Sequence, residues 1–242
     1  MKQNNIHLSR GLTLVELLVV ILIIAALAAL SLLGIARMRS AGDAAATASV
    51  LRQLQVANLS YSVDHSGRYV PMSSNDENEK RSDWPTNPVF LSYFTGDSNR
   101  LAADARSPYP VPTHLLDPVV VRAKKSRWKF LDANFGYNLG GMPELAGPNT
   151  ERNFTVHQVT NAVRTAAFVT ATDWNIRYSG RLIWERDPNE GRTGDGKIAY
   201  RHRGKAAVVY YDGSMGMISP GEMKTIDSSG ATNHPFWRAN FR

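Results

Sequence analysis

The longest apolar run of the chain lies near its N-terminus. From residue 17 to residue 36 no side chain carries a charge, and almost all are apolar. Twenty residues of α-helix span about 30 Å, which is the thickness of the hydrocarbon core of a bilayer. The run therefore predicts a helix that crosses a membrane.

After this run the apolar residues become periodic instead of stopping. They recur every three or four positions, as on one face of an α-helix, at Ala46, Val50, Leu54, Ala57 and Tyr61. Off this face lie Asp43, Arg52, Gln53 and Asn58. We predict one helix from about residue 12 to residue 62, with its second half packed on a globular body. Gly67 and Pro71 are stop signals.

Beyond the helix the pattern changes to that of strands and turns. Residues 73–83 are polar and predict an exposed loop, while the apolar run 89–94 predicts a helix or a buried segment. Strands are expected within 134–141, 166–173 and 181–186. The clearest hairpin has a strand at 205–211, a turn at Asp212-Gly213 and a return strand at 214–218. Because the first of these strands is apolar on both faces, it should be central or covered by the long helix. The fold class expected is α+β, with one long helix on an antiparallel sheet.

Composition agrees with an anchor joined to a polar body. Hydrophobic residues make up 43% of the 242 residues, yet the mean hydropathy is −0.28. There is no cysteine, which excludes disulfides and cysteine-ligated metals. Phosphate-binding loops, dinucleotide-binding glycine patterns and serine nucleophile elbows are missing from the sequence. We therefore expect a protein without an enzymatic site and without a cofactor.

One acidic residue interrupts the apolar N-terminal segment. A carboxylate inside a membrane-spanning helix costs about 2.5–3.5 kcal/mol, and Glu16 stands directly before the uncharged run. A secretory signal peptide, with Lys2 and Arg10 as its basic end and cleavage after Ala28, would release an exported soluble protein. This alternative does not explain Glu16. A plain membrane anchor does not explain it either.

A third interpretation accounts for the glutamate. The segment RGLTLVE at 10–16 resembles the processing site of type IV pilins and of type II secretion pseudopilins. The resemblance implies cleavage between Gly11 and Leu12 by a prepilin peptidase, followed by methylation of the new amine. Glu16 then occupies the fifth position of the mature chain, where it would pair with the amine of a neighbouring subunit. Leu33 stands where many pilins have a proline, which favours an unbroken helix.

This resemblance implies an organisation and a set of partners. It divides the chain into a leader (1–11), a transmembrane helix (12–36), an amphipathic helix (37–63) and a periplasmic α+β domain (64–242). The partners implied are the prepilin peptidase, other pseudopilin subunits, the assembly platform and its ATPase-driven machinery. The location implied is the bacterial inner membrane, crossed once, with the assembled filament in the periplasm or at the cell surface.

A second motif lies near the C-terminus. His202 is followed by nine residues and then by Asp212-Gly213, and an upstream Gly-Tyr-Asn stands at 136–138. This combination resembles a subgroup of pilin-like bacterial proteins. If the chain bends near Gly204, His202 and Asp212 would be able to share a metal. Alternatively, Asp212 caps a hairpin turn and His202 forms a hydrogen bond to a loop.

Two further segments suggest ligands. Oxygen ligands for calcium occur in the segment 186–197, at Asp187, Asn189, Glu190 and Asp195. The segment 121–130 interleaves cations with an aromatic residue, at Arg122, Lys124, Lys125, Arg127 and Trp128. Such a pattern suits single-stranded DNA through phosphate contact and base stacking. The alternative to each is a solvated loop, and the DNA alternative corresponds to a DNA-uptake pilin.

Overall fold

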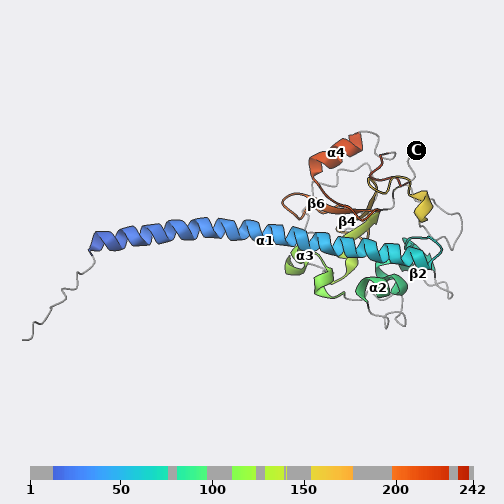
Figure 1. Ribbon diagram of the computed structural model, residues 1–242, viewed down its shortest axis with the longest axis horizontal. Coiled ribbons are helices and arrows are strands. Elements are labelled where there is room, and N and C mark those ends of the chain that lie inside the picture. Colours follow the sequence, from blue (N-terminus) through green and yellow to red (C-terminus); the bar gives the residue numbers. More distant parts are fainter. Residues whose placement is uncertain are drawn as a thin grey trace, which may run out of the picture. The chain divides into compact units, whose positions relative to one another are not determined.

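The computed structural model (Figure 1) describes residues 13–75, 81–96, 111–123, 129–138, 140, 154–176, 198–228 and 234–239. The chain divides into two compact units, residues 1–41 and residues 42–242. The predicted strand at 181–186 lies outside the described residues.

A single helix, α1 (Leu14–Asp64), runs through the end of the first unit and the start of the second. The helix is unbroken at Leu33 and at Gly42, as the absence of proline predicted. It ends where the amide of Gly67 donates to the carbonyl oxygen of Ser62 at 2.8 Å, so the predicted stop is confirmed. We call residues 42–64, the part of α1 in the second unit, the stem.

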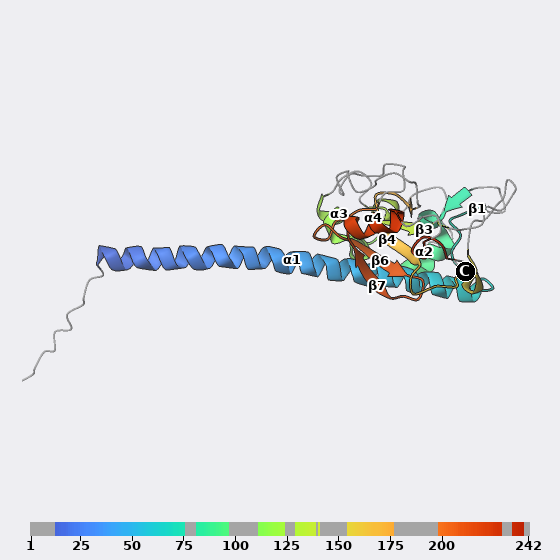
Figure 2. The same ribbon diagram turned by 90° about the horizontal axis from the view of Figure 1, so that it is seen from above.

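The second unit is built around a five-stranded sheet with the order β5-β3-β4-β6-β7. The strands are β3 (Phe135–Asn138), β4 (Ala166–Thr170), β5 (Asn175–Ile176), β6 (Ala206–Tyr210) and β7 (Met215–Ile218). Strands β3, β4, β6 and β7 pair antiparallel, as predicted, but β5 pairs parallel to β3, so the sheet is mixed. The predicted hairpin is β6–β7, and β6 lies inside the sheet, which explains its apolar character on both faces (Figure 2).

The remaining elements are short. They include the helices α2 (Pro88–Thr95), α3 (Pro118–Ala123) and α4 (Pro220–Ser228) and the paired strands β1 (Ser73–Asn75) and β2 (Arg81–Asp83). Single turns of 3-10 helix lie at Trp84–Thr86, Thr113–Leu115, Leu131–Ala133 and Val156–Gln158. The predicted helix at 89–94 is α2. The loop predicted at 73–83 is wrong at both ends, because these ends pair as strands and bury Ser82.

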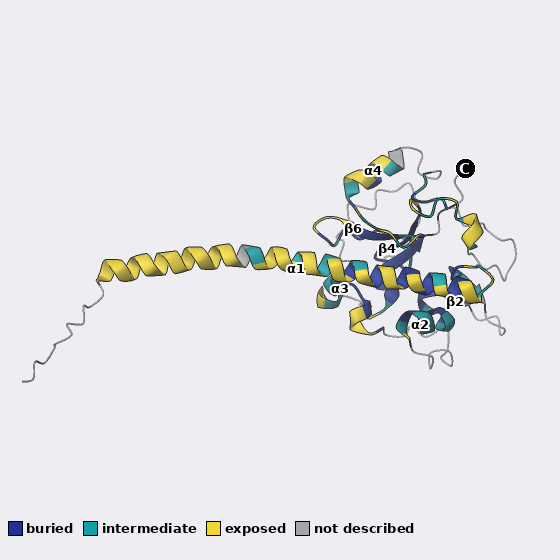
Figure 3. Cartoon of the chain, in the orientation of Figure 1, coloured by how far each residue is buried: buried dark blue, intermediate teal, exposed yellow. Residues whose placement is uncertain are grey.

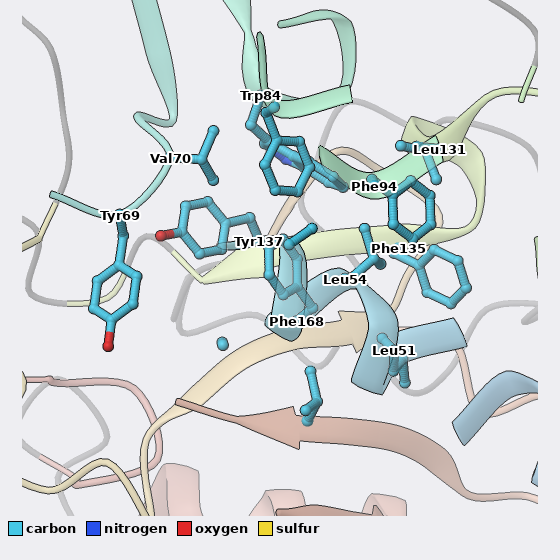
Figure 4. Close-up of a cluster of buried hydrophobic side chains, with 14 of the residues drawn as sticks. Leu51, Leu54, Tyr69, Val70, Trp84, Phe94, Leu131, Phe135, Tyr137 and Phe168 are labelled. Atoms are coloured by element: carbon cyan, nitrogen blue, oxygen red, sulfur yellow. The ribbon is translucent and has the colours of Figure 1, made fainter. Parts of the chain in front are cut away.

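The stem packs on one face of the sheet, and α4 packs on the other. Side chains alternate along β6, so Ala207 and Val209 join the cluster that contains Leu54 of the stem. Ala206 and Val208 join the second cluster, with Met223 of α4 and Trp237. In Figure 4, Leu51 and Leu54 lie beside Phe135, Tyr137 and Phe168 of the sheet.

Burial along the stem differs from the expected helical face at two positions. Val50, Leu54, Ala57 and Tyr61 are buried as predicted. Ala46, however, is exposed. Asn58, expected off the apolar face, is fully buried. The buried face is therefore wider than the apolar pattern and includes polar residues.

A pair of truncations on the stem tests this packing. Leu54→Ala should destabilise the second unit by about 2–5 kcal/mol, because it removes a fully buried side chain between helix and sheet. Val56→Ala, at a position that is 57% exposed, should change stability by less than about 0.5 kcal/mol. Denaturant unfolding followed by tryptophan fluorescence measures both. Equal losses would contradict the described orientation of the stem.

Candidate functional site

The first unit consists, within its described residues, of the N-terminal part of α1. Every described side chain from residue 14 to residue 31 is exposed, including Leu14 at 81% and Leu30 at 68% (Figure 3). Within the part of the chain that the structure describes, α1 is the one helix long and apolar enough to cross a membrane. An apolar surface of this extent is covered by lipid or by other helices in a functional protein.

Glu16 forms a capping box at the start of α1. Its Oε2 accepts hydrogen bonds from the backbone amide and from the hydroxyl of Thr13, each at 2.8 Å. The Thr13 hydroxyl oxygen in turn accepts the amide hydrogen of Glu16 at 3.2 Å. The first amides of a helix have no partner inside the helix, and this reciprocal arrangement satisfies two of them.

The capping box gives Glu16 a role within its own chain, which the sequence analysis missed. The signal was present, because Thr-x-x-Glu before an apolar run is the usual pattern of such a cap. The scissile pair, Gly11 and Leu12, lies outside the described residues. The carboxylate therefore sits at the first described turn, directed back toward the N-terminal side of the helix.

The His–Asp–Gly motif marks the two ends of β6. At one end, His202 and Lys205 exchange backbone hydrogen bonds of 2.9 and 3.0 Å around a two-residue turn. Arg203 and Gly204 in this turn have φ angles of 53° and 73°, as a tight hairpin turn requires. At the other end, Oδ1 of Asp212 accepts hydrogen bonds from the amide and hydroxyl of Ser214, at 2.9 and 2.6 Å. The spacing of the motif thus equals one strand with a turn on either side.

The chain does bend at Gly204, but the bend does not bring His202 to Asp212. The imidazole Nε2 of His202 instead lies 3.5 Å from Oδ2 of Asp117, the residue before α3. Arg201 approaches the same carboxylate oxygen, with Nη1 at 3.4 Å. All three side chains are at most 1% exposed. His202 therefore lies beside the buried ion pair of Asp117 and Arg201. We call these three residues the ion cluster, and it connects the start of α3 to the turn before β6.

Arg201 extends this cluster to the backbone of neighbouring segments. Its guanidinium donates to the carbonyl oxygens of Ala133 at 3.1 Å, Asn134 at 3.0 Å and Ala171 at 2.7 Å. The side chain of Asn134 accepts the amide hydrogen of Asp117 at 3.0 Å. The cluster of Asp117, Arg201 and His202 thus connects α3, the start of β3, the end of β4 and the turn before β6.

The ion cluster keeps its carboxylate charged. Burial by itself raises the pKa of Asp117, but the interaction with His202 and the positive charge of Arg201 outweigh it. The net pKa of Asp117 therefore lies below its ordinary value. Burial lowers the pKa of Arg201, and the charge of Asp117 opposes this effect. Each of the two charges thus stabilises the other inside the protein.

The Gly-Tyr-Asn segment also has a structural explanation. A Cβ atom on Gly136 would lie 2.7 Å from Cγ2 of Ile176, so β3 and β5 approach too closely for a side chain. Tyr137 is fully buried in the cluster under the stem. Asn138 donates to the carbonyl oxygens of Ala166 at 2.9 Å and Trp237 at 3.0 Å. The three residues therefore join β3 to its neighbours and to the C-terminal segment.

The remaining sequence candidates are only partly described. Arg122 forms an ion pair with the stem, and its Nη1 donates to Oδ1 of Asp43 at 2.8 Å while Nη2 contacts Oδ2. Outside the described residues lie Lys124, Lys125, Arg127 and Trp128, and the calcium candidates Asp187, Asn189, Glu190 and Asp195. Among the residues that are described, no three His, Asp or Glu side chains are grouped so that they could hold a metal ion.

Comparison with known proteins places one segment in a family. Residues 6–32 match the model of the prokaryotic N-terminal methylation motif, which covers Gly11, Leu12 and Glu16. The chain therefore carries a type IV pilin-like prepilin signal, the kind of site that a prepilin peptidase processes. Together with one long apolar helix, this signal is consistent with a pilin-like protein anchored by a single pass. No curated protein and no solved structure matches the chain.

Replacing Asp117 tests the ion cluster. Asp117→Asn should destabilise the second unit by about 3–5 kcal/mol at neutral pH, because it leaves the buried Arg201 without its counter-charge. The pKa of Asp117 is lower in the folded state than in the unfolded state, so the ionised carboxylate contributes its full stabilisation above a pH of about 4. This stabilisation is lost as the pH falls toward the pKa of the folded state. Unfolding free energies measured from pH 7 to pH 2.5 report both effects.

Asp212→Asn is the matched control, because this carboxylate is exposed and caps a turn. It should cost about 1 kcal/mol or less. If the Asp117→Asn variant shows the same acid-induced loss of stability as the wild type, Asp117 is not the group that titrates.

Proposed function

We propose that this protein is a pseudopilin-like structural subunit. A prepilin peptidase would process it between Gly11 and Leu12, and it would then assemble through α1 into a type II secretion pseudopilus or a related type IV filament. The observation that carries the proposal is the prepilin signal placed directly before an exposed apolar helix that continues into a folded body. In this arrangement the body is periplasmic and the assembled filament lies in the periplasm or at the cell surface.

The continuity of α1 supports assembly more than simple anchoring. A plain anchor needs a membrane span and a linker, whereas here the same helix goes on to form part of the body's core at Leu51 and Leu54. The apolar part and the body thus share one continuous helix. The lack of cysteine excludes the disulfide-closed loop typical of many type IV pilins and favours the secretion side of the family.

The capping box supports a two-stage role for Glu16. In the membrane its carboxylate is satisfied by Thr13 of the same chain, which reduces the cost of placing a charge at the edge of the bilayer. In the filament the same carboxylate would also reach the methylated amine of Leu12 on a neighbouring subunit. A buried ionic contact of this kind sets the axial register between helices.

The two rival functions receive less support. Signal-peptide cleavage after Ala28 would cut inside α1 and leave the C-terminal part of the helix on the product. DNA uptake through the segment 122–129 would lose one of its cations, because the Arg122 guanidinium is already engaged by Asp43. The other proposed DNA contacts remain predictions from the sequence.

The mass of the mature chain tests the processing step. We expect a first residue at Leu12 with one added methyl group, and we expect Gly11→Trp to keep the leader because the bulky side chain blocks the peptidase site. Intact-mass spectrometry of membrane-extracted protein measures both. A mature chain that starts at Ala29 would establish the signal-peptide alternative.

Two substitutions at Glu16 distinguish the hydrogen bonding of its side chain to Thr13 from the effect of its charge. Glu16→Gln keeps an oxygen that accepts hydrogen bonds from Thr13 but removes the charge, whereas Glu16→Ala removes both. If pairing with the Leu12 amine drives assembly, both variants should insert into the membrane normally. The yield of sheared filaments should fall at least about tenfold for both, which corresponds to a loss of about 1.4 kcal/mol in the free energy of assembly. Membrane fractionation of the same cells provides the insertion control.

Normal filaments from Glu16→Gln, with defective filaments from Glu16→Ala, would show that the cap alone matters. Normal filaments from both variants would refute any assembly role for Glu16.

A further inference from the structure

The first residues of the stem contribute little to the apolar core of the body. The stem residues that belong to this core begin at Val50. Of residues 42–49, which we call the stem start, Thr47 alone is buried. Its hydroxyl has no hydrogen-bond partner among the described residues, and burial of such a group is unfavourable. The stem start therefore needs a further contact to stay on the body.

An ion pair with α3 supplies such a contact. Nη1 of Arg122, in the last turn of α3, donates to Oδ1 of Asp43 at 2.8 Å, while Nη2 contacts Oδ2. Two parallel contacts between planar groups are a strong geometry for an arginine and a carboxylate. The Asp43 side chain is 14% exposed and that of Arg122 is 39% exposed. The pair therefore lies at the surface, where dissolved ions reach it.

The other end of α3 is fixed inside the body. Oδ1 of Asp117 accepts the amide hydrogen of Val119 at 2.9 Å, and Oδ2 lies beside Arg201 and His202 in the ion cluster. Val120, in the middle of α3, is also buried. This short helix thus has a buried N-terminal end, while its C-terminal end contacts the stem start.

We infer that α3 is a salt-sensitive strap, which holds the stem start on the body through the ion pair of Arg122 and Asp43. When the pair opens, the stem start separates from the body, while the stem from Val50 onward stays packed in the core. The Thr47 hydroxyl favours this opening, because water then becomes available to it. The strap needs no partner chain, so it acts in the isolated subunit whether or not filaments form.

Salt is the agent expected to open the strap near neutral pH. The hydrogen bonds to Asp43 raise the pKa of Arg122, and they outweigh the opposing effect of burial. The guanidinium therefore stays charged. Dissolved ions screen exposed charges, with a screening length of about 8 Å at physiological salt and about 3 Å at 1 M. The ion pair should therefore weaken as salt is added.

The absence of cysteine from the sequence allows the opening to be measured. Thr47→Cys places one thiol at the buried position of the stem start in the full-length protein, purified in detergent. This thiol should react with N-ethylmaleimide only when the strap opens. Adding Arg122→Gln should accelerate the reaction at least about threefold, and so should raising NaCl from about 0.05 M to about 1 M without that substitution.

Three control variants isolate the effect. Ala57→Cys, in the part of the stem that belongs to the core, should keep its labelling rate under both changes. Ala46→Cys, at an exposed position, corrects for the effect of nearby charge on the reactivity of a thiol. Arg52→Gln removes an exposed cation from the stem and should leave the labelling rate of Thr47→Cys unchanged.

Exchanging the two charges tests the ion pair itself. Asp43→Arg and Arg122→Asp should each accelerate the labelling of Thr47→Cys. Together they should return the rate to within about twofold of that with the native pair, because opposite charges again face each other. If Thr47→Cys does not fold, Ala48→Cys, at a partly buried position, takes its place.

Three results would overturn the strap. One is an unchanged labelling rate of Thr47→Cys in Arg122→Gln or at high salt. Another is an equal acceleration at Ala57→Cys, because the contact would then support the whole body and not the stem start alone. The third is labelling that stays fast when both charges are exchanged, because the ion pair would then not be the cause.

Discussion

The contact between the stem and the sheet is the interaction on which the rest of the structure depends. Leu51, Leu54 and Ala57 of the stem complete the core formed by β3, β4 and β6. The same helix also carries the exposed apolar segment of the first unit. Without the contact between stem and sheet the body would lose one side of its core.

Buried polar groups form specific contacts in addition to the apolar packing. The buried amides of Gln55 and Asn58 connect the stem to the carbonyl oxygen of Tyr211 and to the backbone amide of Val70. The cluster of Asp117, Arg201 and His202 holds α3 and the turn before β6 to the backbone of the sheet. A buried polar group is costly unless each partner is in place, so these contacts favour one arrangement over its near alternatives.

Glu16, at the N-terminal end of α1, is another polar residue whose contacts are satisfied within the chain. Its carboxylate accepts two hydrogen bonds from Thr13, and this cap accounts for the residue within an isolated subunit. A cap alone does not need a charge, because a neutral amide oxygen accepts the same bonds. The charge also interacts favourably with the positive end of the helix dipole, and cleavage at the prepilin signal would add a cation at Leu12.

Several features of this protein could be predicted from the sequence. The apolar run, the helical period, the turn at Asp212-Gly213 and the prepilin signal each depend on residues within a few positions of one another. Asn58 and Ala46 were misplaced because apolar periodicity does not report which partners surround a helix. Gln55 contacts a carbonyl oxygen 156 positions away, and Arg201 lies 84 positions from Asp117. Only the tertiary structure decided these pairs, because burial and distance between remote segments determine whether a polar side chain finds its partner.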